Sequence, residues 1–139
     1  MTKNKEEIGR KKKTNEFEWL KRKNEIELVY KNGQTMVSKD KKLRAKYFFA
    51  DNKDVNEKVK AGLSVSSDKG NSVWRNRMKR ILRELIRKEK EVFLSVAKQK
   101  NTDFLIIFSP HSIDQGNFNK ITLKDITSPM TDILNKLTK

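Results

Sequence analysis

The chain has 139 residues, 35% of them hydrophobic, which suffices for one compact domain with a modest core. Lys and Arg number 33 against 18 Asp and Glu, and the net charge of +15 indicates a polyanionic partner, nucleic acid first and an anionic membrane surface second. The lack of cysteine excludes disulfides and thiolate metal sites, and the longest apolar run, residues 104–108, is too short to span a bilayer.

Residues 1–14 are rich in Lys and Arg and nearly devoid of apolar side chains. Ordering them would bury too little surface to offset the lost chain entropy, so we expect a disordered basic arm. The arm would act either as a loose tether for a polyanion or as a solubilising tail. It lacks the apolar block of a signal peptide, so we expect a cytoplasmic protein whose folded domain covers residues 15–139.

A first helix is predicted just after the arm. Asn24 is the candidate N-cap, with Glu27 three residues further on, and Gly33 closes the helix. The apolar residues just upstream are expected to pack against this helix: Phe17, Trp19 and Leu20.

Residues 35–66 show the alternation that is typical of strands. In one strand Arg44, Lys46 and Phe48 alternate with an apolar set, and a second strand is predicted over residues 59–66 after a polar turn at residues 51–58. A further strand over residues 104–108 ends at Pro110. This last strand is apolar on both faces and is therefore expected to be central. The apolar set of the first strand is Leu43, Ala45, Tyr47 and Phe49.

Residues 69–90 predict a helix with two opposed faces, since successive side chains turn by about 100°. Asn71 or Ser72 is the candidate cap. Cations far outnumber acids on this helix, which favours RNA binding over a merely solvated surface, because guanidinium groups pair with phosphates and stack on bases. The apolar face comprises Trp74, Met78, Ile81, Leu82, Leu85 and Ile86, and the basic face comprises Asn76, Lys79, Arg80, Arg83, Arg87 and Lys90.

The C-terminal residues 123–137 have apolar side chains at helical spacing, but Pro129 would break a continuous helix. We therefore expect Ser128 to cap a last helix that carries Pro129 in its first turn.

The chain carries few groups that could perform chemistry. His111 is the only histidine and follows Pro110 in a polar loop, where an exposed role is expected. The acids are scattered, with no cluster that suggests a two-metal site. The protein alone is therefore expected to bind no cofactor or metal and to contain no catalytic residue.

Several segments resemble the bacterial ribonuclease P protein family. The sequences GLSVS at residues 62–66 and GNSVWRNRMKRILRE at residues 70–84 are similar to its signature, in order, after a strand and opening a helix. Residues 25–33 resemble its first helix and residues 103–110 its last strand, so the resemblance covers about residues 20–137. The chain departs from the family at Ser67 and Asp68, where two lysines are common, and at Ile26, where an aromatic residue is common.

The resemblance implies an α+β single domain of order αβββαβα. It would contain a four-stranded sheet and three helices, with a left-handed βαβ crossover through the basic helix. Such a crossover runs against a strong general preference, and nothing else in the sequence predicts it.

The resemblance also implies a function: the protein subunit of a ribonucleoprotein endonuclease that removes the 5′ leader of precursor tRNA. Catalysis would lie in the RNA subunit, with Mg²⁺ held through RNA, and neither a membrane nor a small-molecule substrate is expected. The RNA-subunit-binding residues would be Arg75, Asn76, Arg77, Arg80 and Arg87. Matching positions place Tyr30, Lys79 and Arg83 in a leader cleft, to which strand alternation adds Arg44, Lys46 and Phe48.

Some alternatives stay open at this stage. Phe48 is equally suited to stacking on a base and to core packing. A ribosomal protein would show the same charge, size and lack of catalytic residues, but would bind ribosomal RNA without cleaving it. A DNA-binding regulator could present a similar helix, although no helix-turn-helix pair or dimer zipper is evident.

Overall fold

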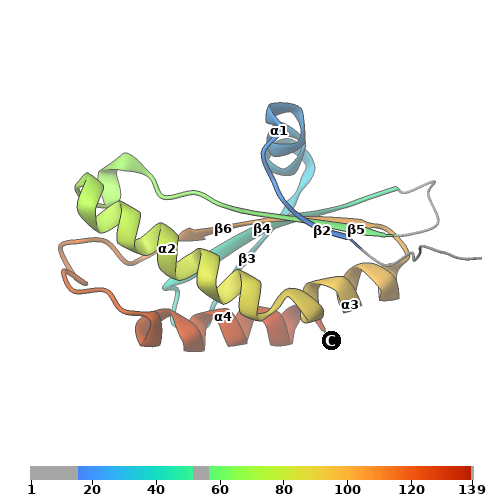
Figure 1. Cartoon of the computed structure of the whole chain (residues 1–139). Helices are drawn as coiled ribbons and strands as arrows, with labels where there is room; N and C mark the ends of the chain where they lie inside the picture. Colours follow the sequence, from blue (N-terminus) through green and yellow to red (C-terminus); the bar gives the residue numbers. More distant parts are fainter. Residues whose placement is uncertain (1–15, 52–56, 139) are drawn as a thin grey trace, which may run out of the picture.

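The computed structural model describes residues 16–51 and 57–138 (Figure 1). The predicted basic arm and the middle of the predicted turn at residues 51–58 lie outside this range. The strands are β2 (Glu16–Trp19), β3 (Gln34–Val37), β4 (Leu43–Ala50), β5 (Lys58–Leu63) and β6 (Asp103–Pro110). The helices are α1 (Lys23–Asn32), the short 3-10 helix η1 (Ser67–Lys69), α2 (Ser72–Lys88), α3 (Lys90–Lys100) and α4 (Leu123–Leu137).

The five strands form one mixed sheet of order β2-β5-β6-β4-β3. The pairs β3–β4 and β4–β6 are antiparallel, whereas β5 runs parallel to both β6 and β2. The prediction that β6 is central is confirmed. The parallel neighbours β5 and β6 are joined through α2 and α3, as a parallel pair requires a crossover. The left-handed sense of this crossover stays a prediction.

The sheet separates two unequal layers (Figure 1). Helix α1 lies alone on one face, and α2, α3 and α4 cover the other. Alternation along β6 directs Leu105 and Ile107 into a small core beneath α1, and Phe104, Ile106 and Phe108 into the larger core beneath the three helices. Both faces of β6 are thus buried, which explains its unbroken apolar sequence.

The predicted count of four strands and three helices is wrong, because the described residues contain five strands and four helices. The additional strand is β2, which pairs with β5. Phe17 and Trp19 pack against the larger core, so the expectation that they pack against the first helix is wrong. Leu20, just after β2, does join Val29 of α1 in the small core. The additional helix is α3, which begins after Glu89 leaves helical geometry at φ −100° and ψ 16°.

Of the two predicted ends of α1, the start is wrong and the end is confirmed. The prediction of Asn24 as cap is wrong, because α1 begins at Lys23 after Arg22, which makes no side-chain capping bond. Gly33 does close the helix. A Cβ at this position would lie 2.3 Å from the Val29 carbonyl oxygen and 2.7 Å from that of Tyr47, so the close approach of two backbone segments requires glycine here.

The predicted start of the last helix is also wrong. Helix α4 begins at Leu123, where Thr122 and Asp125 form a capping box, and it continues through Pro129. Proline lacks the N–H that an interior helical residue donates. The helix nevertheless persists because a buried face packs it onto the larger core, formed by Ile126, Pro129, Met130, Ile133 and Leu134.

Helix α4 is also fixed to the turn between β3 and β4 by polar contacts. The backbone N–H of Lys39 donates to Asp132 Oδ2 at 2.6 Å, and Lys136 Nζ donates to the Val37 carbonyl at 2.7 Å. Lys136 Nζ also lies 3.6 Å from Asp132 Oδ2. The hydrogen bond from the Lys39 backbone is the main cause that lowers the pKa of the Asp132 carboxyl.

We expect Asp132→Asn to lower the free energy of unfolding at neutral pH and to make no difference in strong acid. A carboxyl whose folded-state pKa is depressed stabilises the fold above its unfolded pKa, and this contribution is lost as the pH falls through the folded value. Urea unfolding of both proteins over an acid pH series measures the effect. Asp68→Asn, an exposed acid on η1, serves as control, and a difference that stays constant into acid would contradict the expectation.

Candidate RNA interface

Helix α2 presents its cations on one side because its apolar side is committed to the core. Asn71 is the cap, and its side chain accepts a hydrogen bond from the Trp74 N–H at 2.9 Å. The predicted apolar face is confirmed, since all six members are buried: Trp74, Met78, Ile81, Leu82, Leu85 and Ile86. The opposite side of the helix therefore faces solvent.

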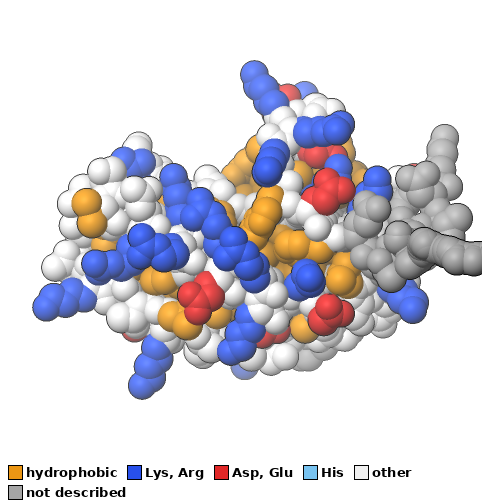
Figure 2. Space-filling view, viewed as in Figure 1, with side chains coloured by type: hydrophobic (Ala, Val, Ile, Leu, Met, Phe, Trp, Pro, Cys, Tyr) orange, Lys and Arg blue, Asp and Glu red, His pale blue; other side chains and the backbone are white. Residues whose placement is uncertain are grey.

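The cations of α2 form a row along the helix, the basic ridge (Figure 2). Among its members Arg75 and Lys79 are half-buried and the others are exposed, as is the neighbouring Asn76. Within the described part of the chain no carboxylate is ion-paired with the ridge, so its charge is open to an external anion. The basic ridge consists of Arg75, Arg77, Lys79, Arg80, Arg83 and Arg87.

The N-terminal end of the ridge adjoins a polar hollow of about 250 Å³. The loop after β6 supports it, since Gln115 Oε1 accepts from the Asn71 backbone N–H at 2.9 Å. Arg75 is held there by a bond from its Nε to the Gly70 carbonyl at 3.0 Å. The hollow is lined by Asn71, Val73, Trp74, Arg77, Gln115, Asn119 and Lys120.

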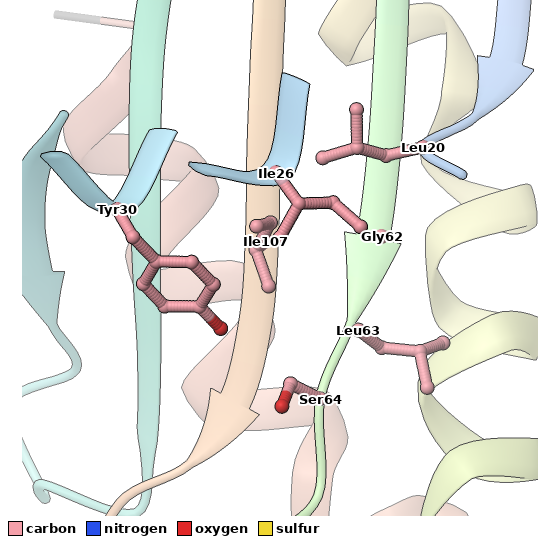
Figure 3. A pocket seen from close by; sticks show the side chains of 7 residues that line it. All are labelled: Leu20, Ile26, Tyr30, Gly62, Leu63, Ser64 and Ile107. Atoms are coloured by element: carbon pink, nitrogen blue, oxygen red, sulfur yellow. The ribbon is translucent and has the colours of Figure 1, made fainter. Parts of the chain in front are cut away.

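A second, more apolar hollow of about 190 Å³ lies between α1 and the sheet (Figure 3). Tyr30 enters it from α1 with its hydroxyl directed toward Ser64, and 45% of the tyrosine is exposed. Ile26, one of the positions where the chain departs from the resembled family, lines the same space. The sequence had not singled out Gly62, Leu63, Ser64 or Ile107 as members of a site. The full lining is Leu20, Ile26, Tyr30, Gly62, Leu63, Ser64 and Ile107.

The three residues that alternation along β4 assigned to the leader lie on the α1 face but do not line this hollow. Lys46 approaches it most closely, with Nζ 5.7 Å from the centre of the Tyr30 ring. Arg44 donates from Nε to Ser109 Oγ at 3.3 Å. Phe48 is half-buried against the small core beneath α1, so most of its ring is engaged in packing.

The ridge and the apolar hollow are neighbours. Figure 2 shows hydrophobic surface between the row of cations along α2 and the base of α1. Lys79 and Arg83 lie one helical turn apart in the middle of that row. The structure therefore places a strip of cations alongside a groove that contains an exposed aromatic ring.

Arg87 is separated from the segment at residues 75–77, since about 18 Å of helix lies between Arg87 and Arg75. Its guanidinium carbon lies 5.6 Å from the centre of the Trp19 ring, on the added strand β2. The sequence had not indicated Trp19 as a site residue. Its position next to Arg87 depends on the pairing of β2 with β5, which no local pattern signals.

Groups for protein-based catalysis are sparse in this interface. His111 is exposed, as predicted, and its backbone carbonyl accepts from Lys69 Nζ at 2.6 Å. Across residues 16–51 and 57–138 no group of three or more His, Cys, Asp or Glu side chains could hold a metal ion. In the same residues no helix is long and apolar enough to cross a bilayer.

The chain is similar in sequence to proteins of one known family. The family model described as Ribonuclease P matches residues 15–137. The chain is 34% identical over 88 residues to the ribonuclease P protein component of Bacillus velezensis, which covers 63% of this chain and 66% of that protein. It is 32% identical over 88 residues to the protein of the same name from Macrococcus caseolyticus, covering 63% of this chain and 67% of that one. The aligned segment thus spans about two thirds of these relatives.

Solved structures share the fold. The ribonuclease P protein of Thermotoga maritima superposes with a TM-score of 0.64 at 18% identity, over 84% of this chain and 94% of that one. The Staphylococcus aureus ribonuclease P protein gives a TM-score of 0.61 at 21% identity, over 87% of this chain and 94% of that one. At these identities the likeness shows the fold alone.

Proposed function

The chain belongs to the ribonuclease P protein family, and from this premise we propose that it is the protein component that works with the ribonuclease P RNA to remove the 5′ leader of precursor tRNA. Membership of the family implies ribonuclease activity in the assembled enzyme and partnership with its RNA. The observation that carries the proposal is the basic ridge, with which no carboxylate of the described residues is ion-paired, beside an apolar hollow with an exposed aromatic ring. Cations hold phosphates and aromatic rings stack on unpaired bases, so both parts suit single-stranded and folded RNA.

Catalysis is proposed to reside in the RNA subunit, with Mg²⁺ held through RNA. The composition supports this division, because the chain has one histidine and no cysteine, and the described residues offer no carboxylate cluster for a metal. The contribution of the protein is then to bind and to position RNA.

The N-terminal half of the ridge is proposed to bind the RNA subunit. Arg77 is exposed and lines the polar hollow, and the α2 N-terminus adds partial positive charge beside it. Arg75 is oriented by the Gly70 carbonyl. The proposed residues are Arg75, Asn76, Arg77 and Arg80, with Arg87 continuing the row toward the far end of the helix.

The apolar hollow is proposed to hold the leader. Tyr30 offers its ring for stacking, and Lys46 lies close enough to that ring to contact a phosphate beside it. Lys79 and Arg83 would bind phosphates from the facing ridge. Arg44 and Phe48 complete the proposed set from β4, although the contacts of Phe48 favour its role in packing.

We expect Tyr30→Ala to weaken binding of leader-bearing precursor by roughly five- to 150-fold, equivalent to about 1–3 kcal/mol for one lost stack, and to leave mature tRNA binding unchanged. Arg83→Ala should act in the same direction through a lost phosphate contact. Arg75→Ala should instead weaken assembly with the RNA subunit. Equilibrium binding of precursor and mature tRNA to the reconstituted enzyme measures the first two, and titration of RNA subunit with protein measures the third.

Two controls accompany this test. Leu123→Ala removes an exposed apolar side chain on α4, away from the hollow, and should leave leader discrimination intact. Circular dichroism must show that Tyr30→Ala remains folded, as the 45% exposure of the tyrosine predicts. If Tyr30→Ala weakens binding of precursor and mature tRNA equally, the assignment of the leader to this hollow is contradicted.

A further inference from the structure

Arg87 lies against an aromatic ring that the larger core holds in place. The guanidinium carbon is 5.6 Å from the centre of the Trp19 ring, within the range of a cation–π contact. Trp19 is half-buried and packs against the larger core, and Phe17 meets it edge-on with ring centres 5.8 Å apart. The indole is therefore a fixed support for a side chain that would otherwise be mobile.

The Arg87 side chain is available to a ligand. It is exposed, and no described carboxylate is ion-paired with it. A guanidinium that rests on an aromatic ring keeps its second face for a base and its N–H edge for a phosphate. Restraint by Trp19 also lowers the entropy that Arg87 would lose on binding.

The contact lies at the β2 edge of the sheet, on the face opposite the apolar hollow, because Trp19 packs toward the larger core whereas the next residue, Leu20, lines the hollow. Trp19 is paired with Ala61 in the sheet, and the residues that follow each of them, Leu20 and Gly62, line the hollow. Arg87 follows Arg83 by one helical turn along the ridge. A strand that leaves the hollow along the ridge, toward the C-terminal end of α2, would therefore reach Arg87.

We propose that Trp19 and Arg87 form a subsite for one unpaired ribonucleotide. Arg87 stacks on the base and donates hydrogen bonds to the phosphate, and Trp19 is a positioning residue that holds the guanidinium. The inference rests on the proposed function in assigning this nucleotide to the leader of precursor tRNA, and it moves Arg87 from the proposed RNA-subunit-binding set to the leader-binding set. An unpaired nucleotide of the RNA subunit presents the same chemistry, and the two sources are separated experimentally.

The test uses the reconstituted enzyme and precursors whose leaders are shortened one nucleotide at a time from the 5′ end. Wild-type affinity should rise with leader length. Arg87→Ala and Trp19→Leu should bind precursors with long leaders about fivefold or more weakly than the wild type does. They should bind precursors whose leaders are too short to reach the subsite with unchanged affinity. Arg87→Lys keeps the charge but lacks the planar stacking group, so it should lose most of the affinity that long leaders add in the wild type.

Lys88→Ala is the matched control. It removes an exposed cation adjacent to Arg87 that takes part in none of the cation–π contacts of the described residues, and it should leave the dependence on leader length unchanged. Arg87→Lys alters only a surface side chain, so the test does not depend on the stability of Trp19→Leu. Tryptophan fluorescence gives a second readout, because Trp74 is buried and its Nε1 is bonded to the Phe118 carbonyl. Long leaders should change the fluorescence of the wild type and not that of Trp19→Leu.

The outcomes are distinguishable. If affinity rises with leader length to the same extent in the wild type and in the Trp19 and Arg87 variants, the proposed subsite is overturned. The assignment of the leader to the apolar hollow is then unaffected. A second outcome is that both variants weaken assembly with the RNA subunit but, once assembled, bind precursors of every leader length with the wild-type affinity. The nucleotide then belongs to the RNA subunit, and the leader assignment is overturned. If the wild type shows no dependence on leader length, the proposed leader function fails together with the subsite.

Discussion

Protein freed of all RNA should not cleave precursor tRNA, and addition of the ribonuclease P RNA should restore leader removal. The reason lies in the side chains available: a single exposed histidine, no cysteine, and no acidic cluster in the described residues that could hold a metal. General acid–base or metal-assisted hydrolysis needs such groups positioned at the scissile phosphate. The measurement is cleavage of labelled precursor by nuclease-treated protein, with and without RNA subunit, at low Mg²⁺.

His111→Ala is the informative control for this expectation. His111 is exposed, and its backbone rather than its imidazole makes the contacts that the structure shows. The variant should therefore support the same rate of cleavage as the wild type once the RNA subunit is present. Cleavage by RNA-free protein that disappears in His111→Ala would place catalysis in the polypeptide and contradict the division of labour proposed above.

Affinity of the protein for RNA as a whole, RNA subunit and leader-bearing precursor together, should fall by about a thousandfold between roughly 50 and 200 mM salt. The basic ridge offers six cations with no described carboxylate partner. Neutralising about six phosphates releases roughly one counterion for each, and the affinity falls with salt concentration in proportion to the number released. Such a steep dependence is specific to many simultaneous phosphate contacts, since screening of one or two surface pairs changes affinity far less. Titrations at several salt concentrations give the slope directly.

Single substitutions on the ridge should reduce that slope by about one phosphate contact each. Arg80→Ala and Arg77→Ala are the best probes, because both side chains are exposed and the opposite face of α2 carries the packing. Lys98→Ala on α3 removes an exposed cation away from the ridge and should leave the slope unchanged. An unaltered slope in both arginine variants would place the main RNA surface elsewhere on the molecule.

Several features of this protein follow from the sequence because they depend on local chemistry. The two faces of α2 are set by the helical period, so every predicted apolar residue is buried and the cations point outward. Asn71 caps that helix through its own side chain, and Gly33 ends α1 where two carbonyl oxygens leave no room for a Cβ. The unbroken apolar run of β6 predicted its central place. The signature at residues 62–84 identified the family.

Other features depend on contacts between segments far apart in the chain, and no local pattern could supply them. Strand β2 exists because β5, some forty residues later, offers it an open edge. Pro129 lies within α4 because burial of the helix against the larger core outweighs the missing N–H, whereas the local rule predicts a break. The apolar hollow collects side chains from α1, β5, β6 and the segment after β2, and the Trp19–Arg87 contact joins a strand to a helix across the edge of the sheet. Sequence periodicity fixes which way a side chain points, but only tertiary packing decides which other segment it meets.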